Sequence, residues 1–239
     1  MIQKLRSFLF TFLFLIWSAF TSVFFVWTLL LPYNWANSIL RHTYNRGIYI
    51  LEKYVLGLDY KVIGMELLPT DQSYIIAAKH QSAYETFKVK LMFEHAVIIL
   101  KEELARIPFW GWYTVKVGGI PINRAQGSAS LKKLVKELKP ALEKHYPVLI
   151  YPQGTRIPAD ATSQEFPYKP GVALIAKSAG NLPIYPMRCN SGEYWPKTGW
   201  LNKKGGVVTF EIRPALTGNN TKEVMAQLEA ELEKRPLTK

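Results

Sequence analysis

A long apolar segment near the N-terminus constrains this chain more than any other feature of its sequence. No charged residue occurs from Ser7 to Leu40, and residues 8–31 are almost wholly apolar. As an α-helix, residues 8–31 would be about 36 Å long, enough to cross the ~30 Å hydrocarbon core of a bilayer. The segment exceeds the ~7–15 apolar residues of a secretory signal, and no small-x-small cleavage site follows it. We therefore predict a retained membrane anchor, with a cleaved signal peptide as the alternative.

The residues around this segment leave its orientation open. Both flanks are basic, so neither is marked as cytoplasmic; the flanking residues are Lys4, Arg6, Arg41 and Arg46. A second helix is predicted over residues 37–58. A pair of helices that enters one leaflet fits the sequence as well as a single span does. We expect the anchor to hold the protein at a membrane, on the cytoplasmic face of a bacterial inner membrane.

The balance of charge predicts an anionic partner. Lys and Arg total 30 against 18 Asp and Glu, which gives a net charge of +12. Because the apolar segment already indicates a membrane, we expect this partner to be lipid and do not expect nucleic acid. The single cysteine, Cys189, excludes an intramolecular disulfide and is typical of a reducing compartment. The four histidines lack the spacing of zinc ligands, so no catalytic metal is expected.

Beyond the apolar region, short β-rich runs alternate with helical patterns. We predict two parts, with membrane-anchoring helices in residues 1–58 and one domain in residues 59–239. Strands are predicted at residues 60–63, 74–78, 97–100, 148–151, 184–187 and 207–212. Helices are predicted over residues 131–142, 172–179 and 220–232, and Pro140 is expected to kink or shorten the first. This alternation predicts an α/β domain with a mixed, largely parallel sheet flanked by helices.

The first candidate functional motif spans residues 79–85 and follows a predicted strand. His80 can accept a proton near neutral pH, and the carboxylate of Glu85 would fix its tautomer and stabilise the imidazolium. On a continuous helix, five residues would turn these two side chains apart. They can meet only if His80 lies in a turn and Glu85 in the first turn of the helix. The non-functional alternative is a surface histidine and a glutamate that stabilises a helix N-terminus.

Three further motifs are marked by glycine, proline or basic residues, and each alone fits an ordinary turn or core strand. Residues 117–124 contain two glycines, which allow close backbone approach, and the planar guanidinium of Arg124. Residues 151–156 join a glycine, a hydroxyl and a guanidinium in one loop suited to an anion. Residues 182–187 contain two prolines, so we expect an edge strand or a strand end rather than a central ladder.

In this order, and behind an apolar N-terminus, the four motifs together resemble the glycerolipid acyltransferases. Within them, the pattern resembles the 1-acylglycerol-3-phosphate acyltransferase family from about His80 to Met187. The resemblance implies an enzyme that moves a fatty acyl group from a thioester to the sn-2 hydroxyl of lysophosphatidate, giving phosphatidate. It implies no metal or organic cofactor. The partners would be a lysophospholipid acceptor and an acyl thioester donor, carried by coenzyme A or by acyl carrier protein.

The resemblance also assigns roles to residues. It implies that His80 is the general base on the acceptor hydroxyl and that Glu85 orients it. Basic residues would bind the acceptor's phosphate, and a backbone N–H of the loop around Gly154 would bind the oxyanion of the intermediate. The substrate-binding residues implied in this way are Lys101, Arg124, Gln153, Gly154, Thr155 and Arg156.

Three residues depart from the pattern of that family. Glu85 stands where an aspartate is usual, and Asn123 and Gln153 stand where acids are usual. The last two changes remove charge and raise the local positive potential. One alternative is therefore an acyltransferase for another lysolipid, such as lyso-ornithine lipid. A second is a membrane-anchored binding protein with a decayed site. Because His80 and a carboxylate are both present, we expect activity.

Overall fold

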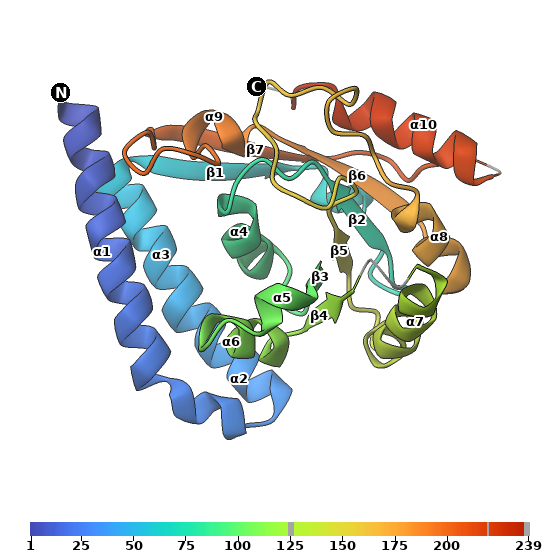
Figure 1. The fold of residues 1–239 in the computed structure, drawn as a ribbon, viewed down its shortest axis with the longest axis horizontal. Coiled ribbons are helices and arrows are strands. Elements are labelled where there is room, and N and C mark those ends of the chain that lie inside the picture. Colours follow the sequence, from blue (N-terminus) through green and yellow to red (C-terminus); the bar gives the residue numbers. More distant parts are fainter. Residues whose placement is uncertain (124–126, 219, 237–239) are drawn as a thin grey trace.

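A computed structural model describes residues 1–123, 127–218 and 220–236. Within these residues seven strands form one sheet in the order β1-β7-β6-β2-β5-β3-β4 (Figure 1). The strands are β1 (Leu58–Ile63), β2 (Ile75–Ala78), β3 (Val97–Lys101), β4 (Gly119–Ile122), β5 (Val148–Ile150), β6 (Ile184–Cys189) and β7 (Gly206–Ile212). Every pair is parallel except β6 with β7, so the predicted α/β fold with a mixed, largely parallel sheet is confirmed.

Helices cover both faces of this sheet, as a parallel sheet requires. The N-terminal helices are α1 (Ile2–Phe24), α2 (Tyr33–Leu40) and α3 (Arg46–Leu51). The helices that follow are α4 (Tyr84–Met92), α5 (Glu102–Ala105), α6 (Trp110–Lys116), α7 (Ser128–Leu142), α8 (Gly171–Ser178), α9 (Ser191–Tyr194) and α10 (Thr221–Leu232).

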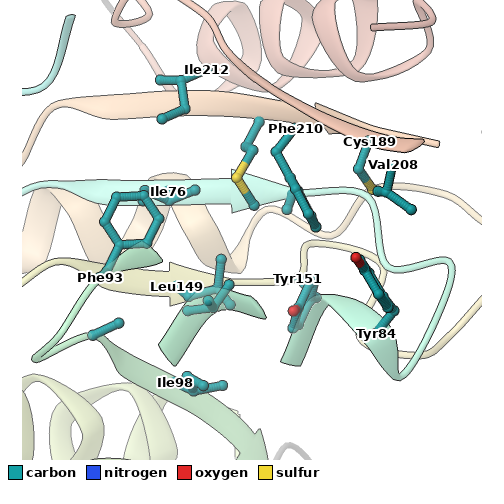
Figure 2. Close-up of a cluster of buried hydrophobic side chains, with 14 of the residues drawn as sticks. Ile76, Tyr84, Phe93, Ile98, Leu149, Tyr151, Cys189, Val208, Phe210 and Ile212 are labelled. Atoms are coloured by element: carbon teal, nitrogen blue, oxygen red, sulfur yellow. The ribbon is translucent and has the colours of Figure 1, made fainter. Parts of the chain in front are cut away.

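Alternate residues of the central strands supply two apolar cores, one on each face of the sheet. Ile76 of β2 joins a core with Tyr84 of α4 and Phe10 of α1. Its neighbour Ile75 points to the other face and joins a core with Leu134 of α7. Figure 2 shows the first of these cores, which lies between the sheet and α4. That core fixes α4 against the strand ends.

The six predicted strands are all present, and the sheet holds one more. The sequence does not predict β4, because Gly119 and Pro121 both weaken a strand pattern. β4 is the last strand in the sheet order, where one side needs no partner. Pro121 is tolerated there because its missing N–H interrupts no second ladder.

The expectation that residues 182–187 form an edge or a strand end rather than a central ladder is wrong. β6 lies inside the sheet, between β2 and β7. Its ladder with β7 begins only at Met187, which faces Ile212. Pro183 and Pro186 both precede that ladder, so neither has to donate to β7. A segment with two prolines can therefore be a central strand.

The three helices predicted in the second half of the chain are present. α7 continues through Pro140 and ends two residues later, so the proline lies in the last turn. α8 ends just before Gly180, whose φ of 98° suits a residue without a side chain. α10 (Thr221–Leu232) follows the predicted bounds closely, and at its start Asn220 Oδ1 accepts from the backbone N–H of Glu223 (3.0 Å).

α1 packs along the rest of the protein rather than standing away from it. Near its start, Gln3 Nε2 donates to the carbonyl of Lys203 (3.1 Å). Further along, Phe10 enters the core beneath the sheet, and Trp17 Nε1 donates to the carbonyl of Tyr44 (3.3 Å). These contacts hold the start of α1 to the α/β domain and its middle to residues 33–56, and Figure 1 shows α1 lying beside α3.

A second helical segment follows α1 and lies against it. It consists of α2, α3 and two π-helical turns, Arg41–Asn45 and Glu52–Leu56, so it begins four residues before the predicted start. Among the described residues, α1 is the one helix long and apolar enough to cross a membrane. The prediction that both segments serve as a membrane anchor, separate from a domain at residues 59–239, stays a prediction.

A buried ion pair joins the second helical segment to α4. The Lys88 ammonium donates to the Glu52 carboxylate, and neither side chain has any exposed surface. Tyr49 and Tyr84 offer ring faces at 4.9 and 4.6 Å from Lys88 Nζ. Burial raises the pKa of Glu52 to about 7 and lowers the pKa of Lys88, because it penalises the charged form of each. Each charge therefore depends on its partner.

Removing one partner of this pair should destabilise the fold strongly. We expect Lys88→Met to lower the melting temperature by roughly 6–20 °C, since an unpaired buried charge costs about 3–5 kcal/mol. Combining it with Glu52→Gln should restore most of the loss, because no unpaired charge remains. Circular dichroism of the detergent-solubilised protein during heating measures both effects. A double variant that melts below the single variant would contradict this account.

Candidate active site

His80 and Glu85 meet at the turn between β2 and α4. β2 ends at Ala78 and α4 begins at Tyr84, so His80 lies in the turn and Glu85 in the first helical turn. His80 Nδ1 is 2.5 Å from Glu85 Oε2, the contact that a continuous helix would not allow. With Nδ1–H donating to the carboxylate, Nε2 is the ring nitrogen that can accept a proton.

The Glu85 carboxylate is fully buried and is surrounded by donors. Its other oxygen, Oε1, accepts from the backbone N–H of Gln81 (3.1 Å) and of Ser82 (2.8 Å). The hydroxyl of Ser191, at the start of α9, donates to the same oxygen. Hydrogen bonds of this kind favour the charged carboxylate, which an apolar site would otherwise penalise. Sequence reasoning does not find Ser191 as a partner, because it lies 106 residues from Glu85.

The aromatic ring of Tyr151 holds the imidazole from the other side. The two rings stack with their centroids 3.9 Å apart and their planes at 18°. The carbonyl of His80 also accepts from the backbone N–H of Ile157 (2.8 Å), which ties the histidine's turn to the loop after β5. Tyr151 belongs to a motif that the sequence singles out, yet its part in orienting His80 is visible only in the structure.

The basic and loop residues implied by the resemblance lie partly together. Lys101, Gly154, Thr155 and Arg156 line the same cavity as His80. The N–H of Gly154 donates to the carbonyl of Tyr151 (2.9 Å), so it closes a turn within the loop. The loop therefore presents the groups that follow this glycine to the cavity.

One of the predicted substrate-binding residues, Gln153, is buried and is not among the described residues that line the cavity. Arg124 lies outside the described residues. Asn123, the residue before it, follows the end of β4, and its carbonyl accepts from the Ser130 hydroxyl of α7.

The cavity has a volume of about 470 Å³ and combines a polar mouth with an apolar interior. The mouth lies where β2, β3 and β5 end, the edge at which parallel sheets usually bind ligands. Its interior is built by α1, α2, α4, β3, α5, α6 and the turns beside them, with apolar side chains from Leu40, Phe87, Ile98, Leu100, Leu104, Ile107, Trp110 and Val117. This arrangement suits a molecule with an anionic head and a long apolar tail.

Among residues 1–123, 127–218 and 220–236, no group of three or more His, Cys, Asp or Glu side chains could hold a metal ion. At His80 the contact between the imidazole and a buried carboxylate has the geometry that general-base catalysis requires. The expectation that the reaction needs no cofactor stays a prediction.

Comparisons with known proteins agree with this geometry. A family model described as Acyltransferase matches residues 59–190. The 1-acyl-sn-glycerol-3-phosphate acyltransferase of Pseudomonas aeruginosa is 37% identical over 90% of this chain and 82% of its own length. The enzyme of the same name from Saccharomyces cerevisiae is 29% identical over 76% of this chain and 60% of its own. The crystal structure of the 1-acyl-sn-glycerophosphate acyltransferase of Thermotoga maritima has the same fold, with a TM-score of 0.76, 22% identity, and coverage of 97% of this chain and 95% of that one.

The thiol of Cys189 should be inert while this site is folded. It is buried 3.8 Å from Glu85 Oε1, and burial, reinforced by that carboxylate, raises its pKa far above the usual range. Because the thiolate is the reactive form, a maleimide at neutral pH should modify the folded protein at least roughly tenfold more slowly than the urea-unfolded chain. Mass spectrometry measures both rates. Equal rates would mean that the site opens in solution.

Proposed function

This chain belongs to the Acyltransferase family, and we propose that it acylates the free sn-2 hydroxyl of a lysophosphatidate, giving phosphatidate for phospholipid synthesis. The acceptor is a lysophospholipid and the donor is an acyl thioester. The activity for which its relatives are named supports this reaction. The observation that carries it is the His80–Glu85 pair at the polar mouth of an apolar cavity.

His80 acts as the general base. Its Nε2 accepts the proton of the acceptor hydroxyl as the hydroxyl oxygen attacks the carbonyl carbon of the thioester. When the tetrahedral intermediate collapses, the C–S bond breaks and the imidazolium gives its proton to the leaving thiolate. Glu85 stabilises the imidazolium between these two transfers, because its carboxylate contacts the ring directly and is held by other donors.

Groups at the mouth of the cavity bind the two anions of the reaction, the phosphate of the acceptor and the oxyanion of the intermediate. Lys101 and Arg156 bind the phosphate of the acceptor, since two cations beside one dianion form strong charge-assisted hydrogen bonds. Arg124 has the same role in the proposal, by its place in the sequence motif. The oxyanion of the intermediate is met by backbone N–H groups of Thr155 and Arg156, because the N–H of Gly154 is engaged within the loop.

The apolar interior of the cavity takes the acyl chain. Most of its lining is contributed by helices and strands, so its depth is fixed by packing. Each methylene that enters contributes about 0.8 kcal/mol to binding until the cavity ends. Coenzyme A and acyl carrier protein both remain carriers of the donor in this proposal, and no metal or organic cofactor takes part in it.

The proposal also places the protein on a membrane, at the cytoplasmic face of a bacterial inner membrane. Phe12, Ile16, Phe20 and Phe24 are exposed on α1 at intervals of four residues and so form one apolar stripe. The opposite face of α1 packs on the domain. Because one face of α1 packs on the protein and the other is apolar and exposed, the helix fits a position parallel to the membrane surface, within one leaflet, better than a path across the bilayer. The +12 charge adds attraction to anionic lipid.

Replacing the proposed base should nearly abolish turnover. We expect His80→Ala to lower kcat about 10²–10⁴-fold, because no group then accepts the hydroxyl proton. Glu85→Gln should lower it less, and Glu85→Asp should retain more activity than Glu85→Gln because it keeps the charge. Initial rates with lysophosphatidate and an acyl thioester in detergent measure these effects.

A matched control for this series is His145→Asn. His145 is exposed and remote from the cavity, and its φ of 56° is one that asparagine tolerates. The His145→Asn variant should keep wild-type activity. Full activity of His80→Ala would rule out the proposed mechanism.

A panel of acceptors separates the proposal from its two alternatives. With lysophosphatidate, monoacylglycerol and lyso-ornithine lipid, each offered with acyl-coenzyme A and acyl carrier protein thioesters, we expect at least roughly tenfold preference for lysophosphatidate, since a lost charge-assisted hydrogen bond costs about 1.5–3 kcal/mol. Arg156→Ala should raise the KM for lysophosphatidate and leave the KM for the donor unchanged. A preference for lyso-ornithine lipid would support the first alternative. No turnover with any pair would support the decayed binding protein.

A further inference from the structure

The helices α5 and α6 form a roof over the cavity, and both faces of this roof are apolar. Trp110 and Tyr113 of α6 line the cavity from its inner face. Phe109, Trp112 and Val115, which we call the outer patch, do not line it and are 37, 47 and 42% exposed. A helix with apolar residues on two sides is expected to have an apolar partner on each. The cavity accounts for one side only.

A strained turn presents the outer patch. Phe109 has φ 61° and ψ −67°, and the N–H of Trp110 donates to the carbonyl of Pro108 (2.7 Å), which together define a γ-turn. A residue other than glycine rarely adopts this backbone, and such strain gathers at functional sites. The result is that the ring of Phe109 lies beside that of Trp112, with 5.4 Å between their centroids.

The outer patch continues the apolar surface of α1 onto the α/β domain. The hydroxyl of Tyr113 donates to the carbonyl of Ser22 in α1 (2.8 Å), so α6 lies against the end of that helix. Immediately beyond this contact, Phe24, Val26 and Trp27 are exposed as well. α6 also packs against residues 26–30, so exposed apolar side chains of α6 and of the segment that follows α1 lie on neighbouring elements, next to the helix that is apolar enough to enter a membrane.

Charged residues beside the roof favour lipid over a second copy of the chain. Lys101, Arg106 and Arg156 are exposed around α5 and the mouth, and they outnumber Glu102 and Glu103 of α5. Basic and tryptophan side chains beside an apolar face are typical of segments that lie at the headgroup level. Two copies would each bring a charge of +12 to the contact, whereas anionic lipid attracts it.

We propose that the outer patch is a lipid-contacting surface, which seats the roof of the cavity in the interfacial layer of one leaflet. The acyl chain of a substrate then passes between bilayer and cavity beside α6 without crossing water. The route of the acyl chain rests on the function proposed above, whereas the lipid contact itself does not. The two can therefore be tested separately.

Site-specific labelling tests the lipid contact without any assay of activity. Val115→Cys carries an environment-sensitive fluorophore, and Leu174→Cys on α8 is the matched control, because Leu174 is similarly exposed and α8 lies at the opposite end of the molecule from α1 (Figure 1). The buried Cys189 takes no label in the folded protein. Vesicles of phosphatidylethanolamine and phosphatidylglycerol should shift the emission at position 115 to the blue and leave position 174 unchanged.

Two results of this experiment would overturn the proposal. One is the absence of a shift at position 115 when the full chain has bound to the vesicles. The other is a shift that appears without vesicles as the protein concentration rises, which would mean that a second copy covers the outer patch.

A pair of substitutions tests the consequence for catalysis. Trp112→Gln with Val115→Gln should weaken vesicle partitioning roughly tenfold, as expected for the loss of two half-exposed apolar side chains. It should also lower the ratio of activity on vesicle-borne lysophosphatidate to activity on detergent-dispersed lysophosphatidate at least roughly fivefold, while Leu174→Gln leaves that ratio unchanged. An unchanged ratio in the double variant would overturn the route. Wild-type protein without activity in detergent would instead refute the proposed function.

Discussion

The buried Glu85 carboxylate is the interaction on which the candidate site depends. A charge without exposed surface is stable only when donors surround it, and here they come from the imidazole of His80, two amides of the turn and the hydroxyl of Ser191. These donors belong to the turn after β2 and to α9, which are far apart in the chain. Satisfying one carboxylate therefore fixes the turn, the start of α4 and the start of α9 relative to one another, and it aims Nε2 of His80 at the cavity.

The length of the glutamate explains how it stands in for the shorter aspartate that the family pattern usually has. From the first turn of α4, one oxygen of Glu85 reaches back to His80 while the other accepts the free amides that precede the helix. The carboxylate thus orients the imidazole of His80 and ties the turn before α4 to the first turn of the helix. Tyr151 completes the arrangement by stacking on the imidazole from the strand next to β2. The polar mouth and the apolar interior of the cavity then follow from where the strands end and how the roof covers them.

Much of the fold could be predicted because strands and amphipathic helices leave local patterns in a sequence. Asn220 at the start of α10 and Gly180 after α8 are residue types that favour helix ends. β4 could not be predicted, because Gly119 and Pro121 are unusual in strands. The two prolines of residues 182–187 likewise led to the wrong position for β6, which lies inside the sheet. Within the site, His80 and Glu85 are close in sequence and were predictable as a pair. Ser191 was not, because its contact is made only when β6 lies beside β2.

Which segments form helices and strands, the apolar character of α1 and the residue types available for acid–base chemistry all follow from the sequence alone. These are properties of neighbouring residues, and neighbouring residues obey the periodicity of helices and strands. Only the tertiary structure decided which side chains meet: the donors around Glu85, the pair of Glu52 with Lys88, and the sideways packing of α1. It also decided that α5 and α6 cover the cavity, that α6 contacts the end of α1, and that Phe109 and Trp112 are exposed. Contacts of this kind depend on the order of strands in the sheet and on close packing between distant segments, and local patterns do not specify either.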